Sequence, residues 1–262
     1  MHLLPSLQPL YILSGFCIGL LVGQTGMGGG ALMTPILVLL FGVHPAAAVG
    51  TDLLYACITK TVGTGVHGAN HSVQWPIVAR LATGSMPATA VTLLAMSRFD
   101  RSSHMASHAI SLVLGAMLLL TAVALLFRER ILVAAGARLG EPSSRRVDML
   151  TIATGAVLGV LVTISSVGAG AIGVTALLLL YPKLPMARIV GSDIAHAVPL
   201  TLLAGVGHWF LGSVNLPMLG SLLFGSIPGI VLGSLLAVRV PDAVLRPILA
   251  VTLAVVGTTL VA

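Results

Sequence analysis

The chain has little charge, few aromatic side chains and almost no cysteine. Charged residues make up 8% of its 262 positions, against about 25% in soluble domains, so a water-soluble domain is excluded. With 57% hydrophobic and 4% aromatic residues, the composition fits neither a disordered protein nor a nucleic-acid-binding protein. The 13 Lys and Arg residues still outnumber the 7 Asp and Glu residues. Such an excess is typical of membrane proteins that keep cationic residues in loops on one side of the bilayer.

Cys17 and Cys57 both lie in apolar runs, where a thiol behaves as a small hydrophobic group. We therefore expect no disulfide and no metal site. The sequence has no G-x-x-x-x-G-K-[ST] nucleotide motif, so the chain alone cannot hydrolyse ATP. It also has no Ser, His and Asp spacing and no cluster of metal ligands that would indicate an enzyme. The sequence thus predicts no cofactor and no enzymatic activity.

Ten apolar runs divide the sequence into two sets of five. They fall at about 8–24, 28–42, 46–66, 76–97, 108–127, 149–166, 168–181, 188–210, 217–238 and 244–262. Between the sets lies the one long charged stretch, 128–148. We predict an all-α, polytopic transmembrane helical bundle with a first repeat at 1–127 and a second at 149–262. The basic stretch 128–148 is predicted to be a cytoplasmic linker.

The two halves match each other at a nearly constant offset. An offset of 140 carries Gly15 onto Gly155, and after one inserted residue an offset of 141 carries Asp52 onto Asp193. Further matches pair Gly19 with Gly159, Gly28 with Gly168, Gly30 with Gly170, Pro45 with Pro185, Gly50 with Gly191, His67 with His208, Gly84 with Gly225, Ser85 with Ser226 and Pro87 with Pro228. Because Asp, His and Pro match in order, the sequence indicates an internal duplication.

The orientation of the two repeats depends on how the first two runs of each half cross the membrane. Five runs per half make the repeats inverted if those two runs together cross an even number of times. If they form a single crossing, each half has four helices and the repeats are parallel. We expect inverted repeats, since the loops carrying Lys183 and Arg239 then share the cytoplasmic side with the linker. Arg98 and Arg101 lie on the outer side in this topology.

Two glycine-rich clusters interrupt long apolar runs at corresponding positions. They contain Gly28, Gly29 and Gly30 in the first half, and Gly168, Ala169 and Gly170 in the second. A helix over 28–41 would rise about 21 Å against a hydrocarbon core of ~30 Å, which favours glycine-broken or re-entrant helices. Such helices present free N–H groups and positive dipole ends to an anion. The alternative is that the small residues only permit close helix packing.

The third run of each half carries polar residues on one helical face. Asp52, Tyr55 and Lys60 lie on this face in the first half, and Asp193 and His196 in the second. Ionisable residues within membrane spans are costly and by default face a pathway. We predict that Lys60 and the glycine clusters bind substrate, and that Asp52, Tyr55, Asp193 and His196 line the pathway or carry coupling protons.

Structural explanations for these residues stay open. The aspartates could cap helices after Gly50-Thr51 and Gly191-Ser192, and any of the charges could find a buried structural partner. Asp52 and Lys60 are two helical turns apart, about 12 Å, so we do not expect them to neutralise one another directly.

The order of these motifs resembles the sulfite exporter TauE/SafE family of membrane permeases. The resemblance covers both halves and rests on 15–35 with its glycine core, 48–53, the second-half echo 190–196, and Gly84 and Gly225 followed by Pro87 and Pro228. It implies a multi-pass secondary carrier of the bacterial inner membrane for small sulfur-containing anions such as sulfite or organosulfonates. The second half lacks an equivalent of Lys60, so we expect an asymmetric substrate site.

The function predicted from the sequence is therefore secondary transport, as an exporter, of a small sulfur-containing anion. Protons are the expected coupling ion, the lipid bilayer is the surrounding partner, and no nucleic acid is involved. A homo-oligomer is compatible with the sequence. The alternatives are a passive anion channel or the membrane subunit of a larger assembly and, further off, a membrane enzyme.

Overall fold

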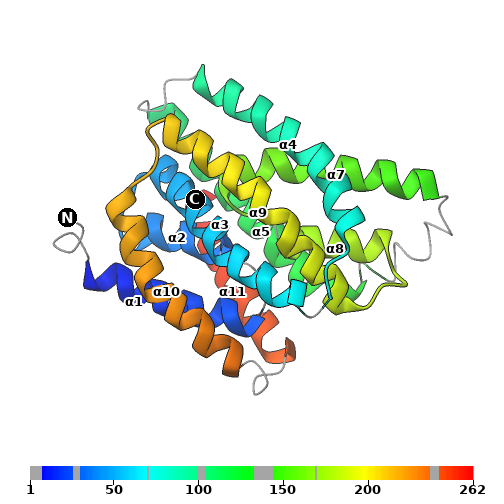
Figure 1. Cartoon of the computed structure of the whole chain (residues 1–262). Coiled ribbons are helices and arrows are strands. Elements are labelled where there is room, and N and C mark those ends of the chain that lie inside the picture. The colour runs from blue at the N-terminus through cyan, green and yellow to red at the C-terminus, as the bar shows by residue number, and fades with distance from the viewer. Residues whose placement is uncertain are drawn as a thin grey trace.

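The computed structural model describes residues 8–25, 30–69, 71–98, 104–130, 132, 144–168, 170–236 and 242–261. These residues form α-helices and their connections, and contain no β-strand (Figure 1). The first half holds α1 (Pro9–Thr25), α2 (Gly30–Leu39), α3 (Pro45–Ala69), α4 (Trp75–Ser97) and α5 (His104–Leu126). The second half holds α7 (Ser144–Ser165), α8 (Ala171–Leu180), α9 (Met186–Phe210), α10 (Leu216–Leu236) and α11 (Asp242–Val261). The predicted all-α class is confirmed, and each predicted run corresponds to one of these helices.

The helices have the length and surface of membrane spans. Within the described residues, five segments are long and apolar enough to cross a bilayer, namely 75–97, 108–126, 144–165, 186–210 and 216–233. Large apolar side chains such as Leu94, Phe210 and Phe224 are exposed on the outside of the bundle. A lipid-facing surface accounts for this exposure, because lipid tails are as apolar as these side chains.

Glycine lets two pairs of helices from opposite halves pack backbone against backbone. Along α1 and α10, a methyl group built on Gly225 would lie 1.9 Å from the carbonyl oxygen of Ile12. Along α4 and α7, a methyl group on Gly84 would lie 1.9 Å from the carbonyl oxygen of Ile152. The two pairs are equivalent under the sequence offset, which carries α1 onto α7 and α4 onto α10. These two pairs therefore join the halves through direct backbone contact.

The central pair, α3 and α9, consists of corresponding helices that run antiparallel. Gly50, near the start of α3, lies against His208 near the end of α9, whereas Gly63 of α3 lies against Ile194 near the start of α9. Figure 1 shows this pair in the middle of the bundle. Corresponding helices that meet antiparallel are what inverted repeats require, since parallel repeats would keep them in the same direction.

A break with left-handed backbone separates α7 from α8. The φ angles are 58° at Ser166, 120° at Gly168 and 129° at Gly170, and only the two glycines tolerate the larger values without strain. The ten residues of α8 rise about 15 Å, half the hydrocarbon thickness. The predicted broken helix is thus confirmed in the second half. In the first half, α2 also has ten residues, and the preceding positions 26–29 lie outside the described residues.

Two hydrogen bonds connect the central helices to loops of the other half. The backbone N–H of Gln74 donates to Ser192 Oγ at 2.8 Å, and the backbone N–H of Asn215 donates to Thr51 Oγ1 at 3.0 Å. These bonds are equivalent under the offset of 141. Each accepting residue directly precedes an aspartate, Asp52 or Asp193. Each loop is therefore bonded to the central helix of the opposite half at the position next to that aspartate.

The predicted linker lies largely outside the described residues, which resume at Ser144 with α7. The last five positions of the predicted linker range are therefore helical. Asp148, the fifth residue of α7, forms an ion pair with Arg80 of α4 at 3.1 Å. This pair connects the two halves at the end of the α4 and α7 pair.

Candidate functional site

Two aspartates and a lysine are buried in the central pair. Asp52 and Lys60 on α3 are 0% and 5% exposed, and Asp193 on α9 is 1% exposed. Both aspartates lie seven positions inside their helices, which begin at Pro45 and Met186. The proposed helix-capping role for the aspartates is therefore wrong, because a cap must precede the first helical turn. Their burial has to be explained by neighbouring side chains.

Asp52 contacts the broken helices of both halves. Thr34 of α2 donates its hydroxyl to Asp52 Oδ2. The hydroxyl of Ser166, in the break between α7 and α8, faces the same carboxylate without reaching good hydrogen-bond geometry. Asp52 Oδ1 has no hydrogen-bond partner among the described residues. Asp52 is thus fixed on one side and unsatisfied on the other.

Asp193 lies against the first turn of α8. A methyl group built on Gly173 would lie 2.0 Å from Asp193 Oδ1, so glycine at this position makes room for the carboxylate. Neither Oδ1 nor Oδ2 has a hydrogen-bond partner within the described part of the chain. Asp193 is therefore the less restrained of the two carboxylates. It also places a negative side chain beside the half-helix whose N-terminus was predicted to bind the substrate anion.

Lys60 interacts electrostatically with the carboxylates of both halves. The stronger interaction is with Asp193, and the weaker is with Asp52 on its own helix. The contact of Gly63 with Ile194 explains this order, since Lys60 is one turn from Gly63 and Asp193 is adjacent to Ile194. Sequence spacing could not reveal the interaction of Lys60 with Asp193, because that residue belongs to the other half.

Tyr55 and His196 occupy corresponding positions and face corresponding serines. His196 Nε2 lies 2.8 Å from Ser85 Oγ of α4. Tyr55 faces Ser226 of α10, although neither hydroxyl reaches a hydrogen-bond partner among the described residues. The offset of 141 converts one arrangement into the other. The duplicated site therefore presents a phenol on one side and an imidazole on the other.

The glycine clusters are only partly covered by the described residues. Gly28, Gly29 and Ala169 lie outside them, whereas Gly30 begins α2, and Gly168 and Gly170 have positive φ. Gly170 occupies the N-cap position of α8 with no side-chain cap. The break thus places a helix start with no side-chain cap among buried residues, and its role in binding stays a prediction.

The structure adds polar residues that the sequence analysis did not assign to the site. They are Thr34, Ser85, Ser166 and Ser226, and all four are buried. A signal existed for two of them, because Ser85 and Ser226 match each other across the repeats. Thr34 and Ser166 have no such signal, since they approach Asp52 only through tertiary packing.

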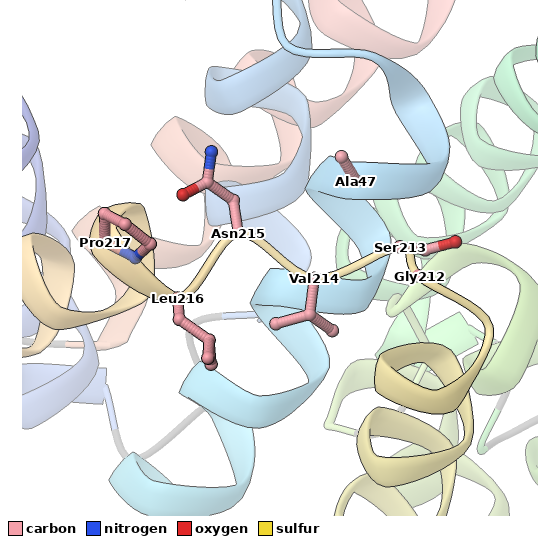
Figure 2. A pocket seen from close by; sticks show the side chains of 7 residues that line it. All are labelled: Ala47, Gly212, Ser213, Val214, Asn215, Leu216 and Pro217. Atoms are coloured by element: carbon pink, nitrogen blue, oxygen red, sulfur yellow. The ribbon is translucent and has the colours of Figure 1, made fainter.

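An open hollow of about 470 Å³ lies where α9 turns into α10 (Figure 2). It is lined by Ala47 of α3 and by residues 212–217. The wall residue Asn215 makes the hydrogen bond to Thr51 described above. The hollow therefore borders the segment of α3 that leads to Asp52.

The chain is similar over almost its whole length to one known family. The family model described as Sulfite exporter TauE/SafE matches residues 11–260. The chain belongs to the TauE/SafE family. The predicted resemblance is thus confirmed, and as a family member the chain is a membrane transporter.

Two relatives from Bacillus subtilis (strain 168) are named as probable membrane transporter proteins. YjnA is 37% identical over 215 residues, which cover 81% of this chain and 83% of that protein. YunE is 34% identical over 70 residues, which cover 27% of this chain and 26% of that protein. No solved structure matches the chain. The relatives support a transport function and carry no statement about substrate or coupling ion.

Proposed function

We propose that this TauE/SafE transporter is a secondary carrier that exports a small sulfur-containing anion, such as sulfite or an organosulfonate, across the bacterial inner membrane. The observation that carries the proposal is the burial of Lys60 in the central helix pair, together with Asp52 and Asp193, where α3 of one half contacts α9 of the other. A buried cation at a repeat interface is the chemistry that an anionic substrate requires. The family description, Sulfite exporter TauE/SafE, supports the choice of a sulfur-containing anion and of export for this proposal.

The packing supports alternating access around this site. The α1 and α10 pair and the α4 and α7 pair are in backbone contact, so each is expected to move as a rigid unit. The central polar residues lie between these pairs, where relative movement would expose them to one side and then to the other. In the proposed cycle, the hollow beside Ala47 and Asn215 is an entrance on one side. The glycine breaks contribute N–H groups to the anion.

Proton coupling is part of the proposal, with Asp52, Asp193 and His196 as candidate carriers. All three are buried and near Lys60. Burial of two carboxylates with one lysine makes the protonation of the site depend on what else is bound there.

Ligand binding can be tested on the purified protein by thermal shift. Sulfite, thiosulfate, sulfoacetate, taurine, sulfate and small carboxylates are compared at tens of millimolar. A ligand that binds only the folded protein stabilises it by RT ln(1 + [L]/Kd), so even a millimolar affinity should raise Tm. Stabilisation by sulfite or an organosulfonate, and not by carboxylates, is the expected result.

Transport is tested by counterflow in proteoliposomes. Proteoliposomes loaded with unlabelled sulfite should accumulate labelled sulfite transiently if the protein is a carrier. Each outward step with unlabelled sulfite then returns the binding site inward with labelled sulfite. A passive channel would only equilibrate the label, and the membrane subunit of a larger assembly would need its partner for any flux. Absence of trans-stimulated exchange for every anion that raises Tm would contradict the carrier proposal.

A further inference from the structure

We infer that Asp193 and the substrate anion exchange places at Lys60, so that each monovalent anion is carried together with one proton bound to Asp193. This inference rests on the proposed function and deepens it, because it selects one coupling residue and sets a ratio. Before binding, the buried side chain of Lys60 interacts electrostatically with the carboxylate of Asp193 across the contact between α3 and α9. The anion takes the place of that carboxylate, and a carboxylate oxygen of Asp193 takes a proton from water on the side of entry. No covalent bond forms, and the total charge of the buried site is unchanged.

The contacts of the two carboxylates point to Asp193 rather than Asp52 as the group that moves. Asp52 accepts a hydrogen bond from Thr34, which holds the carboxylate against α2. Both oxygens of Asp193 lack a hydrogen-bond partner among the described residues, although the side chain is 1% exposed. Its Oδ1 lies against Gly173, where the lack of a side chain leaves room for the carboxylate. A carboxylate with no hydrogen bonds to break can leave Lys60 more easily.

Charge balance explains why the exchange needs a proton. If the anion reached Lys60 while Asp193 stayed ionised, the site would hold the anion and both carboxylates opposite one lysine. Burying such uncompensated charge is strongly unfavourable, whereas a neutral carboxylic acid is tolerated. The anion and the proton therefore favour each other's binding, which is thermodynamic coupling between two sites.

Other charged groups on the surrounding helices do not change the charge balance at Lys60 and Asp193. The helices packed against α9 are α3, α4, α7 and α8. Their titratable or charged residues with described side chains are Asp52, Tyr55, Cys57 and Lys60 on α3, Arg80 on α4, and Arg145, Arg146 and Asp148 on α7, with none on α8. Arg80 and Asp148 pair with each other at a half-exposed helix end. On α9 itself, His196 bonds to Ser85, His208 Nε2 lies 2.9 Å from the carbonyl oxygen of Thr163, and Arg188 lies in the first turn.

The decisive experiment measures anion and proton movement together in proteoliposomes. The probes are labelled sulfite and labelled methanesulfonate, the second of which stays a monoanion at all pH values used. An entrapped pH dye follows protons, and valinomycin with potassium sets the membrane potential. For methanesulfonate we expect one proton per anion, a flux independent of potential, and faster flux when the side of entry is made more acidic.

Three variants assign the proton to a residue. Asp193→Asn should carry methanesulfonate without protons, so its flux becomes dependent on potential. Asp52→Asn should move less anion but keep the ratio of one proton per anion. Asp148→Asn, which removes a carboxylate outside the site, should keep both the rate and the ratio. Gly173→Ala crowds Asp193 Oδ1. We expect this variant to have an altered pH dependence of flux and a Tm close to that of the wild-type protein.

The possible results separate the inference from the proposed function. Methanesulfonate flux in the wild-type protein without proton movement would overturn the inference and leave the carrier proposal intact. An unchanged ratio in a folded Asp193→Asn variant would also overturn it. If Asp193→Asn does not fold, the number of protons per methanesulfonate in the wild-type protein and the pH dependence of flux in Gly173→Ala still test the inference. If neither anion exchanges in the wild-type protein, the proposed function and the inference both fail.

Discussion

Lys60 shows how one buried side chain can be needed both for folding and for binding. Its charge interacts with Asp193 of the other half and, more weakly, with Asp52 of its own helix. Removing one partner of a buried ion pair leaves an uncompensated charge and typically costs about 3–5 kcal/mol. From the sequence, loss of a membrane-embedded charge would be expected to help insertion, but the structure shows that the neighbouring carboxylates must be considered as well.

We therefore predict that Lys60→Ala lowers Tm and abolishes stabilisation by sulfite, and that Lys60→Gln does the same. Adding Asp193→Asn to either variant should recover most of the lost Tm, since it removes the unpaired carboxylate, but should not restore binding. Thermal-shift curves with and without sulfite measure both effects. Sulfite-dependent stabilisation in a well-folded Lys60→Ala variant would show that Lys60 is not the anion site.

At the scale of helices, the glycines of the α1–α10 and α4–α7 pairs are needed for backbone contact. Gly84 and Gly225 correspond under the offset, and in each case the nearest atom to an added methyl group is a carbonyl oxygen of the partner helix. A carbonyl oxygen within a helix cannot rotate away as a flexible side chain could. Substitution must therefore separate the helices.

We predict that Gly84→Ala and Gly225→Ala each lower stability by about 1–3 kcal/mol through overpacking. Gly220→Ala on α10 is the matched control, because nothing lies within 4 Å of the added methyl group. Alanine there should leave Tm unchanged or raise it slightly, as alanine is the better helix former. Equal Tm changes at Gly220 and Gly84 would contradict the packing of these pairs.

The break before α8 gives a second prediction at this scale. Gly168 has a φ of 120° and only ordinary contacts around an added methyl group, so Gly168→Ala tests backbone strain rather than space. We expect a loss of about 1–3 kcal/mol together with weaker sulfite binding, because relief of strain would shift the N–H groups of the break.

Gly42→Ala supplies the control for strain alone. Gly42 has a φ of 62°, and nothing lies within 4 Å of an added methyl group. This variant should lower Tm without changing the affinity for sulfite, as measured by titrated thermal shift. If Gly168→Ala also retains wild-type affinity, the break serves helix packing and not the anion.

For the whole molecule, the antiparallel meeting of α3 and α9 determines which loops share a side of the membrane. These helices begin at Pro45 and Met186, so the connections before them lie at opposite ends of the pair. The connection before α9 contains Lys183, which the positive-inside rule assigns to the cytoplasm.

We predict that Lys183→Cys is labelled by a membrane-impermeant thiol reagent only from the cytoplasmic side and His44→Cys only from the outside. Both changes are made after replacing Cys17 and Cys57 with serine. Inside-out vesicles and intact cells provide the two orientations. Labelling of both positions from the same side would mean that the repeats are parallel.

Several features of this fold were predictable from the sequence because they depend on local order. The hydropathy pattern predicts the helices, and the glycines predict the break at 168–170. The match of Asp52 with Asp193 identifies the duplicated site. The pairing of Lys60 with Asp193 was not predictable, since it depends on how two distant helices cross. The contact of Thr34 with Asp52 likewise has no sequence signal, because hydroxyl residues occur throughout apolar helices.

The packing of α1 against α10, a helix of the other half, also affects biosynthesis. Helix α1 is synthesised before α10, which begins at Leu216, yet the glycines of α1 pack against α10. At about 5–20 residues per second, synthesis of the intervening ~200 residues takes roughly 10–40 s. During that interval α1 lies in the bilayer with a bare backbone stripe facing lipid or an insertion factor. Truncated chains that end before α10 should therefore be sensitive to membrane proteases, whereas chains that include it should be resistant.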